Sequence, residues 1–102
     1  MELKLIEEIK KEKYTARIYQ IDKYEVEVRD FGILNYYKVK TPKDELYAPS
    51  IVHFSSEESG IEEFKIQTAS FGEMSVDELE KYLDAYKKAA VITRILNKEL
   101  LG

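Results

Sequence analysis

The strongest constraint on the fold is a strand-like segment that stops at a glycine and is followed at once by a helix start. Residues Ile61 to Phe71 have the pattern of a strand, and Gly72 ends it. Ser75 and Glu78 then form a capping box, in which the serine hydroxyl accepts from the backbone N–H of Glu78 and the glutamate reaches back to the N–H of Ser75. The sequence therefore predicts a helix that begins at Val76.

The helix is expected to continue to about Leu100, with one apolar stripe on the sheet. This stripe comprises Leu79, Tyr82, Leu83, Tyr86, Ala89, Ala90, Thr93 and Leu96. Val91 and Ile95 fall on the opposite side of the helical wheel and are candidates for an interface with a second copy, which would make a homodimer. Alternatively, the helix ends early or its tail packs against the first strands.

Upstream of the helix, the sequence predicts β-structure. Tyr24 to Arg29 alternates strictly between apolar and polar residues and is the clearest strand. Further strands are expected at 14–21, 33–40, 51–55 and 61–71, with turns between them. Residues 2–10 fit either a helix or a strand, and we favour a strand that forms a hairpin with 14–21.

These elements predict an α+β fold, in which an antiparallel β-meander of about five or six strands packs on one long C-terminal helix. The chain has 102 residues, of which 44% are hydrophobic and 35% charged, as expected for a single domain over residues 1–102. It has no Cys, no basic and apolar leader and no apolar run long enough to cross a bilayer. We expect a cytoplasmic protein that does not contact a membrane.

No pattern of catalytic, cofactor-binding or metal-binding residues is recognisable. His53 is the only histidine, and it has neither a nucleophile nor further metal ligands near it in the sequence. Glu62 and Glu63 are adjacent, so on a strand they point to opposite faces and cannot act as a carboxylate pair. The four glycines are isolated and form no phosphate-binding loop. We therefore predict a non-enzymatic protein without a cofactor or metal ion.

Charge is distributed unevenly along the chain. Residues 44–84 contain eleven Asp and Glu against two Lys, a net charge of −9, within a total of −4. A helix N-terminus accounts for some of these acids, but three pairs lie outside it. They are Asp44 and Glu45, Glu57 and Glu58, and Glu62 and Glu63. Such a surface repels nucleic acid and attracts a protein with a basic surface, although a merely solvated face gives the same pattern.

The run from Phe64 to Gly72 resembles a segment of small early-region proteins of bacteriophages and prophages. In these proteins a strand of the form F-x-I-Q-T-x-S-[FY]-G leads into one long C-terminal helix, and the likeness covers roughly residues 61–96. It implies no catalytic residue, and it implies the host cytoplasm as location. The size, acidity and α+β build are also similar in style to those of small anti-CRISPR proteins.

The favoured function is that of a phage-type protein that binds another protein through its acidic surface, such as an inhibitor of a nucleic-acid-handling or defence enzyme. This requires the acidic pairs to cluster on one surface. An alternative is a module for a small, nucleotide-like ligand, which requires Arg17, Arg29 or His53 in a concave pocket. A homo-oligomeric scaffold is a further alternative, and it requires Val91 and Ile95 to be exposed.

Overall fold

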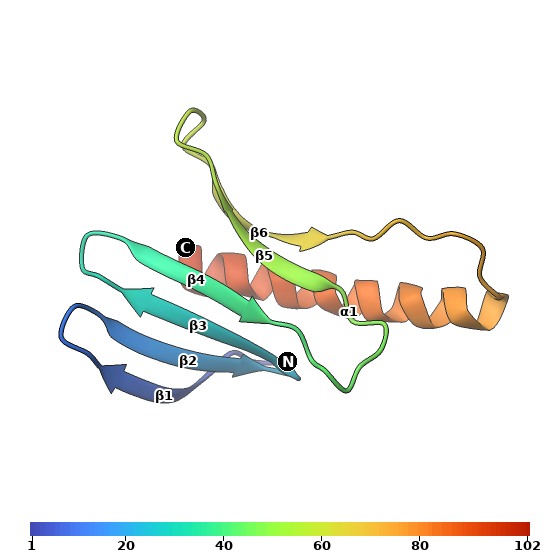
Figure 1. Ribbon diagram of the computed structural model, residues 1–102, viewed down its shortest axis with the longest axis horizontal. Helices are drawn as coiled ribbons and strands as arrows, with labels where there is room; N and C mark the ends of the chain where they lie inside the picture. The colour runs from blue at the N-terminus through green and yellow to red at the C-terminus, as the bar shows by residue number, and fades with distance from the viewer.

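The computed structural model describes residues 1–102 and contains six strands and one helix (Figure 1). The elements are β1 (Lys4–Lys10), β2 (Thr15–Ile21), β3 (Tyr24–Asp30), β4 (Asn35–Lys40), β5 (Ser50–Ser55), β6 (Glu62–Gln67) and α1 (Val76–Leu101). Strands β1 to β4 form an antiparallel meander, and β5 and β6 form a separate antiparallel hairpin. The predicted α+β fold with a long C-terminal helix is confirmed, and residues 4–10 are a strand.

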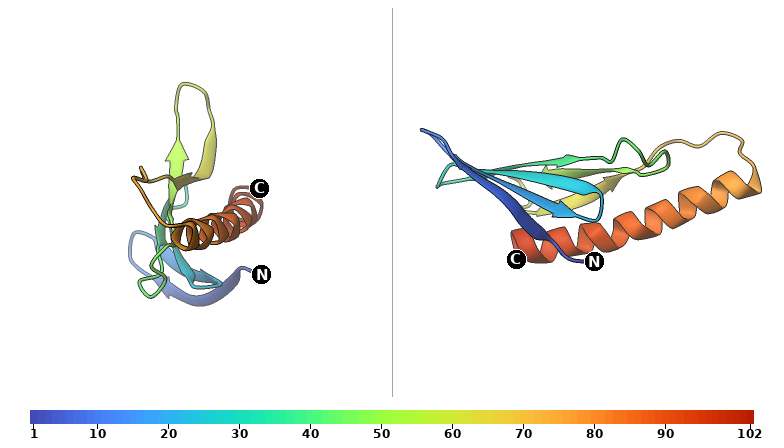
Figure 2. Two further views of the ribbon diagram at one scale, coloured as in Figure 1. Left: turned by 90° about the vertical axis from the view of Figure 1, so that its right-hand side faces the viewer. Right: turned by 90° about the horizontal axis from the view of Figure 1, so that it is seen from below.

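The strands form one layer and α1 lies across one face of it (Figure 2). Strands β4 and β5 are neighbours, but no hydrogen-bonded ladder joins them. Side chains close this seam instead. The Thr41 hydroxyl donates to the Ser50 hydroxyl at 3.3 Å, and the rings of Tyr37 and His53 lie 4.6 Å apart. The two sheets are therefore joined by side-chain packing and by the helix that covers both.

Strict alternation along β3 decides which face of the meander is buried. Tyr24, Val26 and Val28 point toward α1 and are buried, as the sequence predicts. The residues between them face solvent, where the guanidinium of Arg29 lies 3.0 Å from the carboxylate of Glu27. One face of β3 is buried and the other carries charged side chains. This fixes the register of β3 with its neighbours, because a slip of one residue would exchange the two faces.

The hydrophobic core forms where the second half of α1 meets both sheets. Its buried members are Ile21, Tyr24, Val26, Val28, Tyr37, Ile51, Phe64, Ala89, Ile92 and Leu96. From α1, only Ala89 and the residues after it belong to this core. Of the stripe predicted for the first half of the helix, Tyr82 and Tyr86 are half-buried and pack on Phe71, whereas Leu79 is 42% exposed and Leu83 is 50% exposed. The prediction is wrong for the two leucines because they lie roughly 100° and 140° around the helix from the buried Leu96, in turns that extend beyond the end of the strands (Figure 2).

The start of α1 is confirmed at Val76, with Ser75 as its N-cap. The Ser75 hydroxyl accepts from the backbone N–H of Glu78 at 3.1 Å. The reciprocal bond, from the Ser75 N–H to the Glu78 carboxylate, does not form. Only one of the two side-chain bonds of the predicted capping box is therefore present. Asp77 and Glu78 in the first turn favour the positive end of the helix dipole.

Strand β6 ends at Gln67, four residues before the predicted end at Phe71. The correction has a geometric cause, because α1 begins beyond the sheet and the chain must travel to that point without a neighbouring strand (Figure 1). Residues 68–75 make this connection. Phe71 packs on Tyr82 and Tyr86 with ring centroids 4.7 and 5.9 Å apart, and the Tyr86 hydroxyl accepts from Ala69 N–H.

The side chain of Asn97 bonds to the free edge of β6. Its Oδ1 accepts from the backbone N–H of Phe64 at 2.6 Å, and its Nδ2 donates to the Phe64 carbonyl at 3.3 Å. One amide thus replaces the two bonds that a further strand would make at this position. It blocks strand addition at Phe64 and joins α1 to the two-stranded sheet.

We expect Asn97→Ala to destabilise the protein by about 1–3 kcal/mol, because both backbone groups of Phe64 lose their partners. The measurement is urea unfolding at constant slope. Asn97→Asp is the matched control, since it has similar helix propensity and keeps the acceptor. It should fall between the parent and Asn97→Ala. Equal midpoints for all three would show that water satisfies this edge equally well.

Candidate functional site

The six acidic candidates lie in two groups at opposite ends of the β5–β6 hairpin (Figure 1). Asp44 and Glu45 are in the connector that precedes β5, whereas Glu57 and Glu58 are in the turn between β5 and β6. Glu62 and Glu63 begin β6, next to that turn. The structure therefore brings four of the six predicted residues together and separates the other two from them.

Asp44 and Glu45 take part in an ion-pair network that joins the connector to the β2–β3 turn. Lys23 Nζ lies 3.4 Å from the Asp44 carboxylate and 3.6 Å from that of Glu45. Lys88 of α1 lies 3.5 Å from Glu45 and 2.7 Å from Asp22. The bond from Lys88 lowers the pKa of Asp22, and the same bond raises the pKa of Lys88. These two acidic candidates thus already have partners within the chain.

Tyr24 lies buried beside this network. Its hydroxyl donates to the Pro49 carbonyl at 2.6 Å, which joins β3 to the start of β5. Burial, reinforced by the charges of Glu45 and Asp22, raises the pKa of Tyr24 to about 12. The connector end of the hairpin is therefore a polar junction that supports the fold.

The opposite end of the hairpin is a hydrogen-bonded turn that projects away from the rest of the molecule (Figures 1 and 2). Ser56 N–H donates to the Ile61 carbonyl, and Gly60 N–H donates to the Ser56 carbonyl, both at 2.9 Å. Gly60 has a φ of +70°, a conformation that favours glycine. Glu57 and Glu58 lie in this turn, exposed and without an ion-pair partner in the chain.

Glu62 and Glu63 leave the turn on opposite faces of β6, as predicted. On the inner face, Glu62 Oε1 lies 2.8 Å from His53 Nε2. On the outer face, Glu63 lies 3.6 Å from Lys65 Nζ. His53 also packs against the rings of Tyr37 and Phe64, so its role is to hold the hairpin together. The four carboxylates at this end of the hairpin, those of residues 57, 58, 62 and 63, are named the acidic tip below.

Exposed apolar side chains on the outer face adjoin the acidic tip, and sequence reasoning missed them. Val52 is 40% exposed, Phe54 39% and Ile61 51%. Lys65 Nζ lies 4.0 Å from the centre of the Phe54 ring. A signal for them was present, since apolar residues at both 51 and 52 and an aromatic at 54 place apolar side chains on both faces of one strand.

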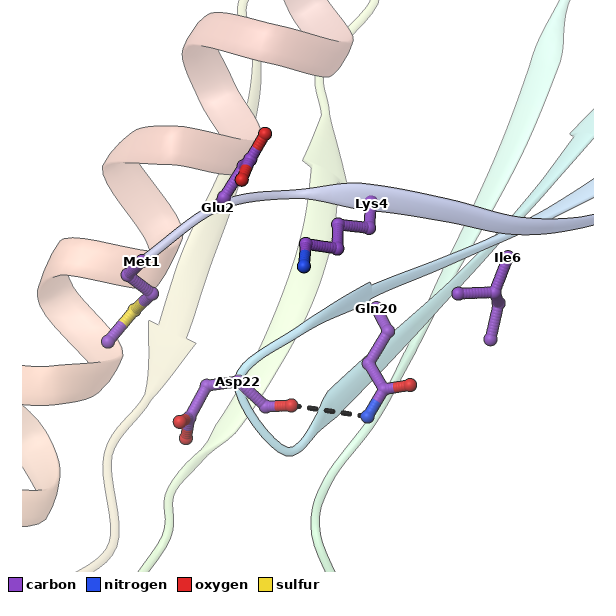
Figure 3. A pocket seen from close by; sticks show the side chains of 6 residues that line it. All are labelled: Met1, Glu2, Lys4, Ile6, Gln20 and Asp22. Atoms are coloured by element: carbon purple, nitrogen blue, oxygen red, sulfur yellow. Dashed lines mark hydrogen bonds between the residues drawn. The ribbon is translucent and has the colours of Figure 1, made fainter.

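Two hollows of the surface lack the residues that the small-ligand hypothesis requires. A cavity of about 600 Å³ opens between the N-terminal segment and β2, lined by Met1, Glu2, Lys4, Ile6, Gln20 and Asp22 (Figure 3). Another, of about 420 Å³, is walled by Tyr47, Tyr82 and Tyr86. Neither cavity is lined by an arginine or by the histidine.

The two interface candidates on α1 differ in their surroundings. Val91 is 42% exposed, as predicted. Ile95 is half-buried and packs against the core, so its placement on the far side of the helix is wrong. The cause is that β-structure lies on a broad arc of the second half of α1, which the helical wheel alone does not show.

No three His, Asp or Glu side chains lie close enough together to hold a metal ion. The single helix is not apolar enough over a sufficient length to cross a membrane. Comparisons with protein-family models, with curated proteins and with solved structures found no match to this chain.

We expect the stability of the protein to fall between pH 10 and 12 because of Tyr24. The unfolded tyrosine loses its proton near its ordinary pKa of 10.0, whereas the folded one does so near 12. The stabilisation is thus complete below pH 10 and is lost as the pH rises through the folded pKa. Urea unfolding from pH 8 to 12 should show a shallower decline for Tyr24→Phe than for the parent. Parallel declines would mean that Tyr24 titrates alike in both states.

Proposed function

We propose that this protein is non-enzymatic and acts by binding another protein through the acidic tip. The observation that carries the proposal is the pair Glu57 and Glu58, held by an ordered turn at the end of a projecting hairpin with no ion-pair partner in the chain. Ordering the turn before binding reduces the entropy that binding costs. The matching partner has a basic surface, since unpaired carboxylates speed encounter with positive charge.

A basic groove that normally holds nucleic-acid phosphates has the chemistry that fits this surface. Carboxylates of the acidic tip would occupy the phosphate positions, and Phe54 and Ile61 beside them would add apolar contact. A phage-type inhibitor of a nucleic-acid-handling or CRISPR-type defence enzyme in the host cytoplasm is the form of this function that we propose. The resemblance of residues 61–96 to phage early-region proteins supports it, and the acidic tip argues against direct binding of nucleic acid.

The test is capture of a partner from host lysate by the parent and by Glu57→Lys/Glu58→Lys. We expect the double variant to lose capture while its thermal melt stays unchanged, because both side chains are exposed and unpaired. Captured partner should also be released by added heparin, a polyanion that competes for the same basic groove.

Glu7→Lys/Glu12→Lys is the matched control, because it changes net charge equally at two exposed sites on the β1–β2 hairpin. This control variant should capture the partner as well as the parent does. Equal loss in both variants would point to net charge rather than to the acidic tip. Normal capture by Glu57→Lys/Glu58→Lys would refute the proposal.

A further inference from the structure

The face of α1 that points away from the sheets carries apolar side chains that nothing in the chain covers. Val76 is 71% exposed, and Leu79, Leu83 and Val91 are between 42% and 50% exposed. Three of the four lie in the first half of the helix, which extends beyond the strands (Figure 2). We name these four residues, with the exposed charged residues on the same side of the helix, the outward face of α1. The charged residues are Glu80, Asp84, Lys87, Arg94 and Lys98.

Charge on the outward face is divided by sign along the helix. Glu80 and Asp84 lie in its first half, Lys87 lies close to its middle, and Arg94 and Lys98 lie in its second half. All five are exposed, and none forms an ion pair within the chain. The helix dipole acts only within the first and last turns, so it accounts for Lys98 but not for the other four.

The spacing of these charges is unfavourable in a single helix. Glu80 and Asp84 are four residues apart, and so are Arg94 and Lys98. Like charges at this spacing are neighbours on the helix surface and repel one another. Lys87 lies three residues after Asp84 and offsets part of the repulsion in the acidic pair. An opposite charge from another chain beside each pair would offset the remainder.

We infer that α1 packs against α1 of a second copy in antiparallel orientation, through its outward face. An antiparallel arrangement with its two-fold axis near residue 89 places Glu80 and Asp84 of each copy beside Lys98 and Arg94 of the other. Both contacts form at once, since a two-fold axis near the middle of the helix relates them. Leu83 and Val91 lie between the charges and supply the buried apolar contact.

A second copy is favoured as occupant because this surface is complementary to itself. A parallel pairing would set acid against acid and base against base along the whole helix. The acidic tip lies on the β5–β6 hairpin and not on this face, so the dimer leaves it free (Figure 1). The inference is therefore independent of the proposed function.

The test uses two charge-reversed variants of the full chain in analytical ultracentrifugation. The parent should sediment as a dimer at high micromolar concentration. Glu80→Lys/Asp84→Lys sets like charges together at both contacts, and so does Arg94→Glu/Lys98→Glu. Each variant alone should dimerise at least about 100-fold more weakly than the parent, because facing like charges cost several kcal/mol.

An equimolar mixture of the two variants should restore the dimer, since every contact is again between opposite charges. Thermal melts of the separate variants check that both remain folded. A parent that sediments as a monomer would overturn the inference. So would a parent dimer that both folded variants retain. A mixture that stays monomeric, with both variants folded, would likewise rule out the antiparallel charge pairing.

Discussion

Packing of the second half of α1 on the inner face of both sheets is the interaction on which the rest of the structure depends. The meander β1–β4 and the hairpin β5–β6 share no backbone ladder, so nothing in their own hydrogen bonding fixes one relative to the other. A two-stranded hairpin is marginally stable alone. Ile92 and Leu96 are fully buried between the sheets, and Asn97 bonds to the edge of β6. The helix therefore supplies the covering that neither sheet has without it.

Two parts of the molecule project because the core occupies only the middle. The first half of α1 extends past the strands at one end, and the acidic tip extends from the hairpin (Figure 1). Both carry exposed apolar side chains next to charges that have no partner within the chain. Uncovered apolar surface of this kind is typical of interaction sites. The fold thus separates a buried centre from the two exposed surfaces that we propose as binding sites.

The acidic residues have different roles according to their neighbours. Asp44 and Glu45 lie within reach of Lys23 and Lys88 and hold the connector in place. Glu57 and Glu58 lie on a turn and form no ion pair within the chain. The same residue type therefore forms ion pairs within the fold at one end of the hairpin and is exposed without such a pair at the other. Net charge over residues 44–84 does not distinguish these roles.

Local sequence determined the elements of this fold. Alternation in β3, the cap at Ser75 and the long apolar periodicity after Val76 are interactions between near neighbours, so they were predictable from the residues alone. Only the tertiary structure decided which apolar residues are covered. Leu79 and Leu83 were predicted in the same stripe as Leu96, yet only Leu96 meets the sheets. The two residues lie roughly 100° and 140° around the helix from Leu96, in turns that extend past strands of six or seven residues. The sequence also did not show which acidic pairs would have partners within the chain. Lys23 and Lys88 are distant from Glu45 in sequence and lie near it only after folding.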